Sequence, residues 1–443
     1  MTFCAKTSLL FWKVPEDMSP EMISWARDLF PICRSITGEG IRESLGYFER
    51  LNPEFKREIF KTGEKVFDWE IPREWNIRDA FIEHESGQRF AEFSKLNLHV
   101  VGYSAPVNKT VSKEELLEHL FTQEDQPELV PYVTSYYNER WGFCMSENAR
   151  KALPDGNYKV FIDSDLSEGT LELSHALIEG SSRSEIFFSS YLCHPSMVNN
   201  ELSGPVLLNA IMHYIKSEFP ESNYSYRFVM LPETIGSIAY LSRYHENLKR
   251  NMLCGFNLSC VGDERAYSHV LSRKGDSLAD AALAAGLTGL PNVKTYSFLE
   301  RGSDERQYCA PGIDLPVCGF SRSKYGEFPE YHTNADTFDV VTQQGLEGAL
   351  DVMKSIVKSL ELGLYPKTSI LCEPQLGKRG LYPSISHKGH YDSVQTRMDF
   401  IAYSDGYTSI FDIAKRIGKP LAKVCEEYEI LKENQIIDGS TEI

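Results

Sequence analysis

The chain lacks the features that would place it in a membrane or in an oxidising compartment. No stretch approaches the roughly 20 apolar residues that span a bilayer. Its ten cysteines are scattered and include no C-x-x-C pair, which favours reduced thiols over a disulfide framework. The apolar run at 9–12 is too short for a signal peptide. We therefore expect a cytoplasmic protein.

Positive charge is also scarce. Lys and Arg total 46 against 63 Asp and Glu, so the formal net charge is −17. Non-specific binding to nucleic acids or anionic membranes depends on Lys and Arg, and the composition argues against both partners. The length of 443 residues and the hydrophobic content of 42% suit a globular protein with a large core.

Several common catalytic motifs are absent as well. The sequence contains no H-E-x-x-H, no G-x-S-x-G, no Walker A and no G-x-G-x-x-G motif. The cysteines form no recognisable Cys–His nucleophile motif. Zincin-type proteases, serine hydrolases, P-loop enzymes and dinucleotide-binding enzymes are therefore disfavoured.

Strand-like and helical segments alternate over most of the chain. This alternation predicts an α/β domain, a mixed sheet with helices on both faces, built from residues 1–52 and 126–365. The expected strands are 158–163, 185–193, 226–231, 252–258 and 315–318. The expected helices are 21–30, 41–51, 204–215, 236–244, 276–285 and 343–360.

Two regions depart from this alternation. Residues 53–125 are rich in β-branched and aromatic residues and are broken by glycines, which predicts a small inserted β domain, with strands at 58–67, 75–83 and 96–107. Residues 366–443 contain three short helical patterns, typical of a winged-helix domain. Because this tail carries 10 Lys and Arg against 11 Asp and Glu, we expect domain packing, a protein partner or self-association rather than DNA binding.

Three segments that follow predicted strands carry candidate catalytic groups. His194 lies in the first, Glu233 in the second and His332 in the third. Strand ends of an α/β sheet meet at one edge, where such enzymes place their sites. Each His alone is better explained as a hydrogen-bonded surface residue. Together, two His and one Glu suit a divalent metal, above all zinc, with a position left for water.

The same segments resemble the M28-type zinc aminopeptidases, a superfamily that includes single-zinc glutaminyl cyclases. Residues 331–337, Y-H-T-N-A-D-T, are close to the family's Y-H-T-P-x-D-T, and His194 with N-E-L-S-G at 200–204 aligns with its H…D-N-x-S-G. More closely, the chain resembles bacterial aminopeptidase-like proteins linked to polysaccharide biosynthesis, which carry an inserted β domain and a C-terminal winged helix. Residues 31–40 and 193–197 look like signatures of that group.

The resemblance implies roles for individual residues. His194 would bind one metal ion, and His332 with Glu233 would bind the other. Tyr331 would match the tyrosine that stabilises the oxyanion, and Asp336 would orient the His332 loop.

The chain departs from the family at its acidic positions. Asn200, a weaker neutral ligand, stands where the metal-bridging Asp is expected, and Ser259 replaces the other Asp ligand. Pro232 occupies the position of the general base. Because two zinc ions would face only Glu233, we expect at most one tightly held zinc, with Asp304 as a substitute ligand.

The missing base leaves several candidates for proton transfer. Glu201 and Glu305 are two of them, and Glu233 is a third if Asp304 completes the metal site instead. Arg301 is a candidate for pairing with a substrate carboxylate, although a structural salt bridge explains it equally well.

The sequence therefore predicts metal-dependent hydrolysis of an amide. The substrate would be an N-terminal peptide bond or an N-acyl amino sugar. Two alternatives stay open. The missing acids suggest a degenerate peptidase fold that serves as a binding or scaffold protein, and the resemblance to glutaminyl cyclases suggests single-zinc acyl transfer or cyclisation.

Overall fold

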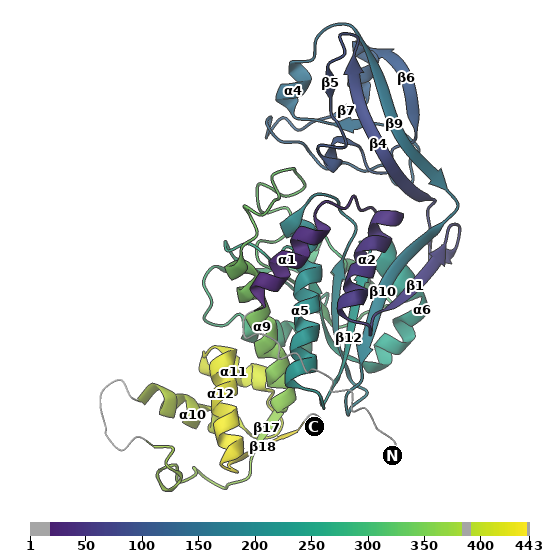
Figure 1. Ribbon diagram of the computed structural model, residues 1–443. Helices are drawn as coiled ribbons and strands as arrows, with labels where there is room; N and C mark the ends of the chain where they lie inside the picture. Colours follow the sequence, from purple (N-terminus) through teal and green to yellow (C-terminus); the bar gives the residue numbers. More distant parts are fainter. Residues whose placement is uncertain (1–17, 383–390, 441–443) are drawn as a thin grey trace, which may run out of the picture.

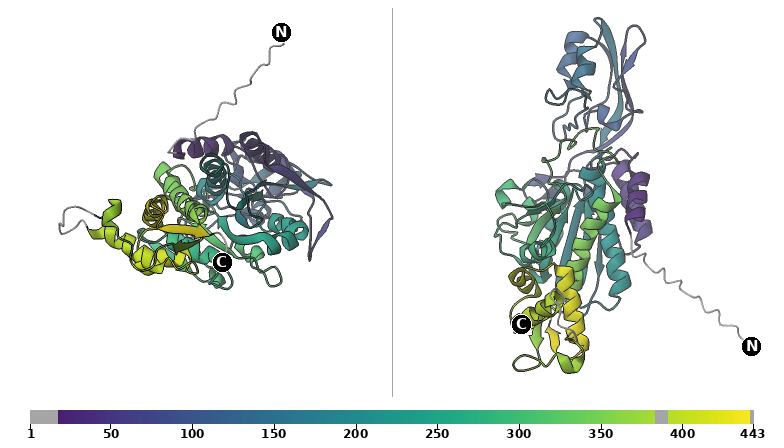
Figure 2. Two further views of the ribbon diagram at one scale, coloured as in Figure 1. Left: turned by 90° about the horizontal axis from the view of Figure 1, so that it is seen from below. Right: turned by 90° about the vertical axis from the view of Figure 1, so that its left-hand side faces the viewer.

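A computed structural model describes residues 18–382 and 391–440. The first apolar run, on which the absence of a signal peptide was predicted, lies outside these residues. Figure 1 shows three parts in a row: a β-rich insert at one end, an α/β domain in the middle and a helical C-terminal domain at the other end. The side view in Figure 2 shows the same order along the long axis. No helix of the described residues is both long and apolar enough to span a membrane.

The α/β domain is built on an eight-stranded mixed sheet of order β1-β10-β12-β11-β13-β16-β14-β15. The central strands β12, β11, β13 and β16 are parallel, and both flanks include antiparallel pairs. Its strands are β1 Lys56–Lys61, β10 Thr170–Ile178, β11 Glu185–Tyr191, β12 Ser225–Leu231, β13 Met252–Leu258, β14 Tyr267–Val270, β15 Val293–Tyr296 and β16 Val317–Ser321.

Helices cover both faces of this sheet, which confirms the predicted fold class. Successive residues of β11 point to opposite faces: Ile186 and Phe188 join one hydrophobic core, and Phe187 joins the other. The first core is packed against α1 Ser19–Leu29, α2 Glu39–Leu51, α5 Ser203–Glu218, α7 Leu278–Gly286 and α9 Gln343–Leu362. The second is packed against α6 Ile235–Asn251 and α8 Glu305–Tyr308. Figure 1 shows α1 and α5 side by side in front of the sheet.

The insert has its own four-stranded sheet of order β5-β4-β9-β6 and its own core. Its main strands are β4 Glu74–His84, β5 Arg89–Phe90, β6 Val107–Ser112 and β9 Asn157–Ser167. Shorter elements are α3 Lys113–Glu118, β7 Leu120–Phe121, β8 Phe143–Cys144 and α4 Glu147–Lys151. A hairpin of β2 Lys65–Val66 and β3 Trp69–Glu70 precedes it.

The strand pairing gives the insert boundaries other than the predicted 53–125. Strand β1 pairs with β10 in the central sheet, so it belongs to the α/β domain. Strand β9 pairs with β4 over ten residue pairs, so it belongs to the insert. These partners are remote in sequence, and a composition change cannot reveal them. The strand predicted at 96–107 is instead a short 3-10 turn, Asn97–His99, followed by a loop.

The C-terminal domain has the winged-helix elements. They are α10 Tyr391–Tyr403, α11 Ile410–Ile417, α12 Leu421–Glu433 and a two-stranded sheet of β17 Tyr365–Thr368 and β18 Ile437–Ser440. Helix α12 packs against α9, where Ser359 Oγ lies 3.0 Å from Cys425 Sγ and Lys358 pairs with Glu429 at 2.8 Å. The last helix of the domain is therefore engaged by the α/β domain.

Candidate active site

The three predicted segments meet at one edge of the central sheet. His194 follows β11, Glu233 follows β12, and His332 lies in the loop after β16. His194 Nε2 lies 3.7 Å from Glu233 Oε2, and the rings of His194 and His332 have centroids 5.5 Å apart. The structure thus brings together the two imidazoles and the carboxylate that the sequence analysis selected.

Glu201 fixes the orientation of the His194 ring through its contact with Nδ1. His194 Nδ1 lies within hydrogen-bond distance of Glu201 Oε2, at 2.7 Å, and Glu201 comes from the π-helical turn Val198–Leu202. Buried Arg34 donates to the carbonyl of His194 at 3.2 Å and lies 3.8 Å from Glu201. Burial raises the pKa of Glu201 to about 8 and lowers that of His194 to about 3. When the proton is on Nδ1, Nε2 is free to bind a metal ion. Metal-binding histidines commonly have a hydrogen-bonded carboxylate at their other ring nitrogen. These contacts fit a positioning role for Glu201 rather than the predicted general base.

Glu233 begins a strained turn. Thr234 has φ 66° and ψ −76°, and the N–H of Ile235 donates to the carbonyl of Glu233 at 2.8 Å, which together define a classic γ-turn. Such a conformation is costly for a β-branched residue and persists only where the surroundings enforce it. Asp304 Oδ1 accepts the N–H of Thr234 at 2.8 Å, and Arg306 donates to the Thr234 hydroxyl. The turn directs the Glu233 side chain at the site.

Glu233, whose side chain is 23% exposed, has the fully buried acid Asp304 as a neighbour. Burial, reinforced by the charge of Asp304, raises the pKa of Glu233 to about 8. Burial likewise raises the pKa of Asp304 to about 6. Asp304 Oδ1 also accepts the Ser237 hydroxyl at 2.7 Å, whereas Oδ2 is buried without a hydrogen-bond partner among the described residues. Two such carboxylates favour a proton or a cation between them. Asp304 Oδ1 therefore stabilises the turn that carries Glu233. This contact fits a residue that supports Glu233 better than it fits the predicted metal ligand.

His332 is held by the insert as well as by its own loop. Its φ is 56°, in the left-handed region, and its carbonyl accepts the N–H of Tyr132 at 2.8 Å. The Tyr132 ring lies edge-on to both histidines, with centroids 5.1 Å from His194 and 5.2 Å from His332. Tyr331 stacks on His332 with centroids 3.9 Å apart. Tyr132 escaped the sequence analysis, because nothing in its local sequence reveals that an insert loop folds over the site.

Asp336 links the His332 loop to the His194 loop. Its carboxylate accepts the backbone N–H groups of Asn199 at 2.7 Å and Asn200 at 2.8 Å. The predicted orienting role thus acts on the segment that carries Glu201. Asn200 Oδ1 accepts the Tyr191 hydroxyl at 3.2 Å, so the amide proposed as a weak metal ligand already has a protein partner.

Two other predicted site residues have contacts that fit structural roles. The Glu305 carboxylate accepts the Gly302 N–H at 3.0 Å, the Tyr325 hydroxyl at 2.5 Å and the Asn257 amide at 2.9 Å. With both oxygens engaged by its own loop, by β13 and by the Tyr325 segment, Glu305 is poorly placed to act as the predicted base. Arg301 is exposed, and its guanidinium lies over the Phe298 ring at 4.6 Å. These contacts favour a surface role over the predicted substrate pairing.

The signature at 31–40 also has a structural explanation. Arg34 supports the His194 carbonyl, and Thr37 Oγ1 accepts the N–H of Trp75, the second residue of β4, at 3.1 Å. Gly38 has φ 96°, and a Cβ there would lie 2.2 Å from the Trp75 carbonyl. The segment therefore ties the root of the insert to the back of the site.

Two of the three predicted donors, His194 and Glu233, are spaced for one zinc ion, whereas the ligand atoms of these two and His332 do not all lie within 4.8 Å of one another. From zinc–ligand bonds of about 2.0–2.2 Å, two tetrahedral ligand atoms lie about 3.4 Å apart and two imidazole centroids roughly 5 Å apart. The observed separations of 3.7 Å and 5.5 Å are within a few tenths of these values. A second ion would need the acids that Asn200 and Ser259 replace. Cys193 forms a separate possible metal-binding cluster with His194 and Glu201, but burial raises the pKa of its thiol well above the usual value, and its sulfur accepts the N–H of Glu233.

Comparisons with known proteins agree with this picture. The family described as a domain of unknown function (DUF4910) matches residues 23–363, and the winged helix-turn-helix family matches residues 364–439. A Clostridium acetobutylicum protein, named for polysaccharide biosynthesis and an aminopeptidase-like domain, is 39% identical over 411 residues, covering 91% of this chain and 93% of its own. A crystal structure of a Clostridium acetobutylicum protein named as a peptidase is 36% identical, with a TM-score of 0.86 over 95% of this chain and 96% of that one.

More distant structures share the fold. A zinc aminopeptidase from Bacillus subtilis has a TM-score of 0.56 at 13% identity, over 78% of this chain and 95% of that one. An M28 peptidase precursor from Shewanella amazonensis has a TM-score of 0.53 at 10% identity, over 80% and 98%. The predicted resemblance is confirmed: the chain belongs to the DUF4910 family of aminopeptidase-like proteins, with the M28 peptidase fold and a C-terminal winged helix.

Proposed function

We propose that this protein is a single-zinc hydrolase of the aminopeptidase type. The observation that carries the proposal is the pair of contacts made by His194: its Nδ1 lies 2.7 Å from Glu201 Oε2, and its Nε2 faces Glu233 at 3.7 Å. His194, Glu233 and His332 would hold the ion, a two-His, one-carboxylate set of the kind found in catalytic zinc sites. Bound zinc would supply Lewis acidity to the scissile carbonyl and lower the pKa of water.

The chain's own residues would position groups and move the proton. Glu201 keeps the His194 tautomer, and the Thr234 turn, held by Asp304, aims Glu233. We assign proton transfer to whichever of Glu233 and Asp304 does not bind the ion, because Glu201 and Glu305 are committed to other partners. The Tyr331 hydroxyl would donate to the oxyanion, and its stacking on His332 keeps the ring beside the site.

The substrate would be an N-terminal peptide bond or an N-acyl amino sugar. The fold of the zinc aminopeptidases supports the first, and the polysaccharide name of the Clostridium relative supports the second. The nine described cysteines are all free thiols, which supports the predicted cytoplasmic location. Because α12 is packed on α9, we expect the C-terminal domain to serve packing, a protein partner or self-association rather than nucleic-acid binding.

A scaffold role is the second candidate, motivated by Asn200 and Ser259 at expected acidic positions. Against it stands the strain around the site. Ser196, Thr234, Cys260 and His332 all have positive φ, and each lies in a loop that follows a strand of the central sheet. Strain of this kind is retained where it serves a function. Cyclisation is the third candidate function. Its product differs from that of hydrolysis, and mass spectrometry distinguishes the two products.

Metal content tests the proposal directly. Elemental analysis of protein purified without an affinity tag or added metal should find about one zinc per chain. His332→Ala should lose it, together with any amidase activity on aminoacyl and N-acetyl amino sugar substrates. His245→Ala is the matched control, since this histidine bonds the Leu241 carbonyl on α6 and should leave the zinc in place. Wild-type protein that stays free of zinc after zinc is supplied would refute the hydrolase and favour the scaffold.

A further inference from the structure

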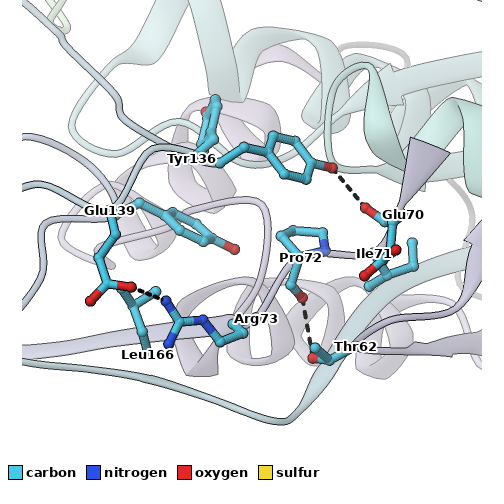
Figure 3. Close-up of a pocket in the computed structure, with 10 residues that line it drawn as sticks. Thr62, Glu70, Ile71, Pro72, Arg73, Tyr136, Glu139 and Leu166 are labelled. Carbon is cyan, nitrogen blue, oxygen red and sulfur yellow. Dashed lines mark hydrogen bonds and ion pairs between the residues drawn. The ribbon is translucent and has the colours of Figure 1, made fainter.

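A second cavity lies where the insert meets the α/β domain. Its volume is about 420 Å³, within the range of small-molecule sites. Figure 3 shows its walls: the β3–β4 connection supplies Glu70 to Arg73, and the opposite wall comes from the insert loop with Tyr136 and Glu139. Tyr103 and Tyr137 also line it. Both domains therefore contribute to the cavity, and the site described above does not account for it.

This cavity shares a wall with the candidate metal centre. The Tyr136 hydroxyl lies 3.2 Å from the hydroxyl of Tyr132. Tyr132 in turn places its ring against His194 and His332. A substrate that fills the cavity would therefore have its far end close to the catalytic groups, with this pair of tyrosines between the two.

Aromatic side chains line the inner part of the cavity, and charged side chains lie at its rim. Tyr103 is buried, stacks on Trp75 with centroids 5.7 Å apart and meets Tyr136 edge-on at 5.4 Å. Tyr137 is 53% exposed and lies near the mouth, where its hydroxyl donates to the Glu70 carbonyl at 2.9 Å. Ile71, Pro72 and Leu166 add apolar surface.

The charged groups of the rim are already paired. Arg73 donates to Glu139 at 2.5 Å, and Glu70 accepts from Lys65 at 2.5 Å. A peptide with a free carboxylate would need an uncommitted cation here, and a lone charged group would have to break one of these pairs. A neutral ring with apolar faces and a rim of hydroxyl groups fits better, because tyrosine rings can cover its faces while carboxylates and the guanidinium bond its hydroxyls.

We propose that this cavity binds a neutral glycosyl group of the substrate, away from the bond that is cleaved. The claim that the glycosyl group belongs to a substrate rests on the proposed hydrolase function. The claim that the cavity binds a glycosyl group does not rest on it. If the hydrolase reading holds, this subsite favours an N-acyl amino sugar over a plain peptide. Its binding energy would then orient the reacting amide, as remote contacts do in enzymes.

Binding measured without turnover tests the cavity separately from the chemistry. Isothermal titration calorimetry of the full chain with N-acetylglucosamine, chitotriose and maltotriose should give a Kd of about 1 mM or tighter for at least one sugar. Tyr137→Ala and Arg73→Ala should each weaken that sugar about fivefold or more while zinc content stays unchanged. Tyr407→Ala, which removes a 71% exposed tyrosine from the C-terminal domain, is the matched control.

The outcomes separate the two proposals. Sugar binding that survives in zinc-free His332→Ala supports the cavity even if no hydrolysis is found. Amidase activity on a peptide with no binding of any of the three sugars overturns the cavity assignment. Binding of the tripeptide Ala-Ala-Phe that is lost in Tyr137→Ala, without sugar binding, would replace the glycosyl group by a peptide side chain. Sugar binding unchanged in both cavity variants would place the sugar elsewhere and refute the proposal.

Discussion

Two buried clusters of this protein each combine one cysteine, one histidine and one carboxylate, but their hydrogen bonding differs. Cys193, His194 and Glu201 form one, and His269, Asp280 and Cys318 form the other. In each, a histidine nitrogen lies within hydrogen-bond distance of a carboxylate oxygen, at 2.7 Å for His194 and 3.1 Å for His269. The members of each cluster are equally hidden from solvent, so composition and burial do not distinguish them.

The difference lies in what else the carboxylate and the imidazole contact. Asp280 accepts the Ser272 N–H at 2.8 Å and the Ser277 N–H at 3.0 Å, and both serine hydroxyls bond it as well. These bonds cap helix α7 and, together with the His269 contact, lower the pKa of Asp280 to about 2. Both oxygens of the Asp280 carboxylate are thus hydrogen-bonded within the fold.

The Glu201 carboxylate is satisfied far less completely. Its Oε1 has no hydrogen-bond partner among the described residues, and burial raises its pKa to about 8. His194 keeps Nε2 turned to a second acid, Glu233. A cluster whose polar atoms still lack partners can bind a ligand, whereas a cluster whose polar atoms are hydrogen-bonded contributes to the stability of the fold. Matched substitutions in the two clusters test this reading.

The largest difference is expected when each histidine is removed. His194→Ala should abolish zinc binding and lower amidase activity by about a thousandfold or more, because it deletes a proposed ligand. His269→Ala should keep about one zinc per chain and lose thermal stability instead. Elemental analysis and differential scanning calorimetry of both variants give the comparison. Zinc lost from His269→Ala and kept by His194→Ala would reverse the assignment.

A smaller contrast is expected for the carboxylates. Glu201→Gln should weaken zinc affinity by about 10–100-fold, the usual effect of changing the group behind a ligating histidine. Asp280→Asn should leave that affinity unchanged and lower the free energy of unfolding by about 2–3 kcal/mol, because the buried Ser272 and Ser277 donors lose bonds to a charged acceptor. Competition with a zinc chelator and urea denaturation measure the two quantities. Equal zinc affinity in Glu201→Gln and wild type would argue against the role of Glu201.

The smallest effect is a dependence of stability on acid. The pKa of Asp280 is about 2 in the folded chain, below its ordinary value of 3.8. A depressed pKa contributes stability that is complete above about pH 4 and lost as the pH falls toward 2. Over that window wild type should lose more free energy of unfolding than Asp280→Asn, by on the order of 2 kcal/mol. Parallel pH profiles for the two proteins would contradict the pKa shift.

Much of the fold was predictable because its signals are local. The parallel strands β11 and β12 are buried along their whole length, and each contains a short apolar run, 186–188 and 228–231, that marks it in the sequence. Helices α5, α6 and α9 follow from their periodic apolar faces. Strands β14 and β15 were not predicted, since each has only four residues and depends on partners elsewhere in the chain. The boundaries of the insert depend on pairings such as β1 with β10 and β4 with β9, which bring together residues far apart in sequence.

The candidate site divides in the same way. His194, Glu233 and His332 could be found because each follows a strand in a recognisable motif, and strand ends gather at one edge. The separate tasks of Glu201, Asp304 and Glu305 could not be assigned, since three buried acids near a site look alike in sequence. In the folded chain Glu201 contacts a histidine, Asp304 holds a turn and Glu305 bonds neighbouring segments. These roles depend on where each side chain points, which the sequence does not show.

By itself, the sequence determined the α/β class, the winged-helix tail and the residue types of the site, because apolar periodicity and short motifs act over a few residues. Only the tertiary structure decided that Tyr132 of the insert lies against both histidines, that Thr234 is held in a γ-turn and that the insert and the α/β domain enclose a cavity beside the site. Each of these features arises from contacts between segments that the chain brings together only on folding. Their energies depend on distance and direction, which residue order alone does not specify.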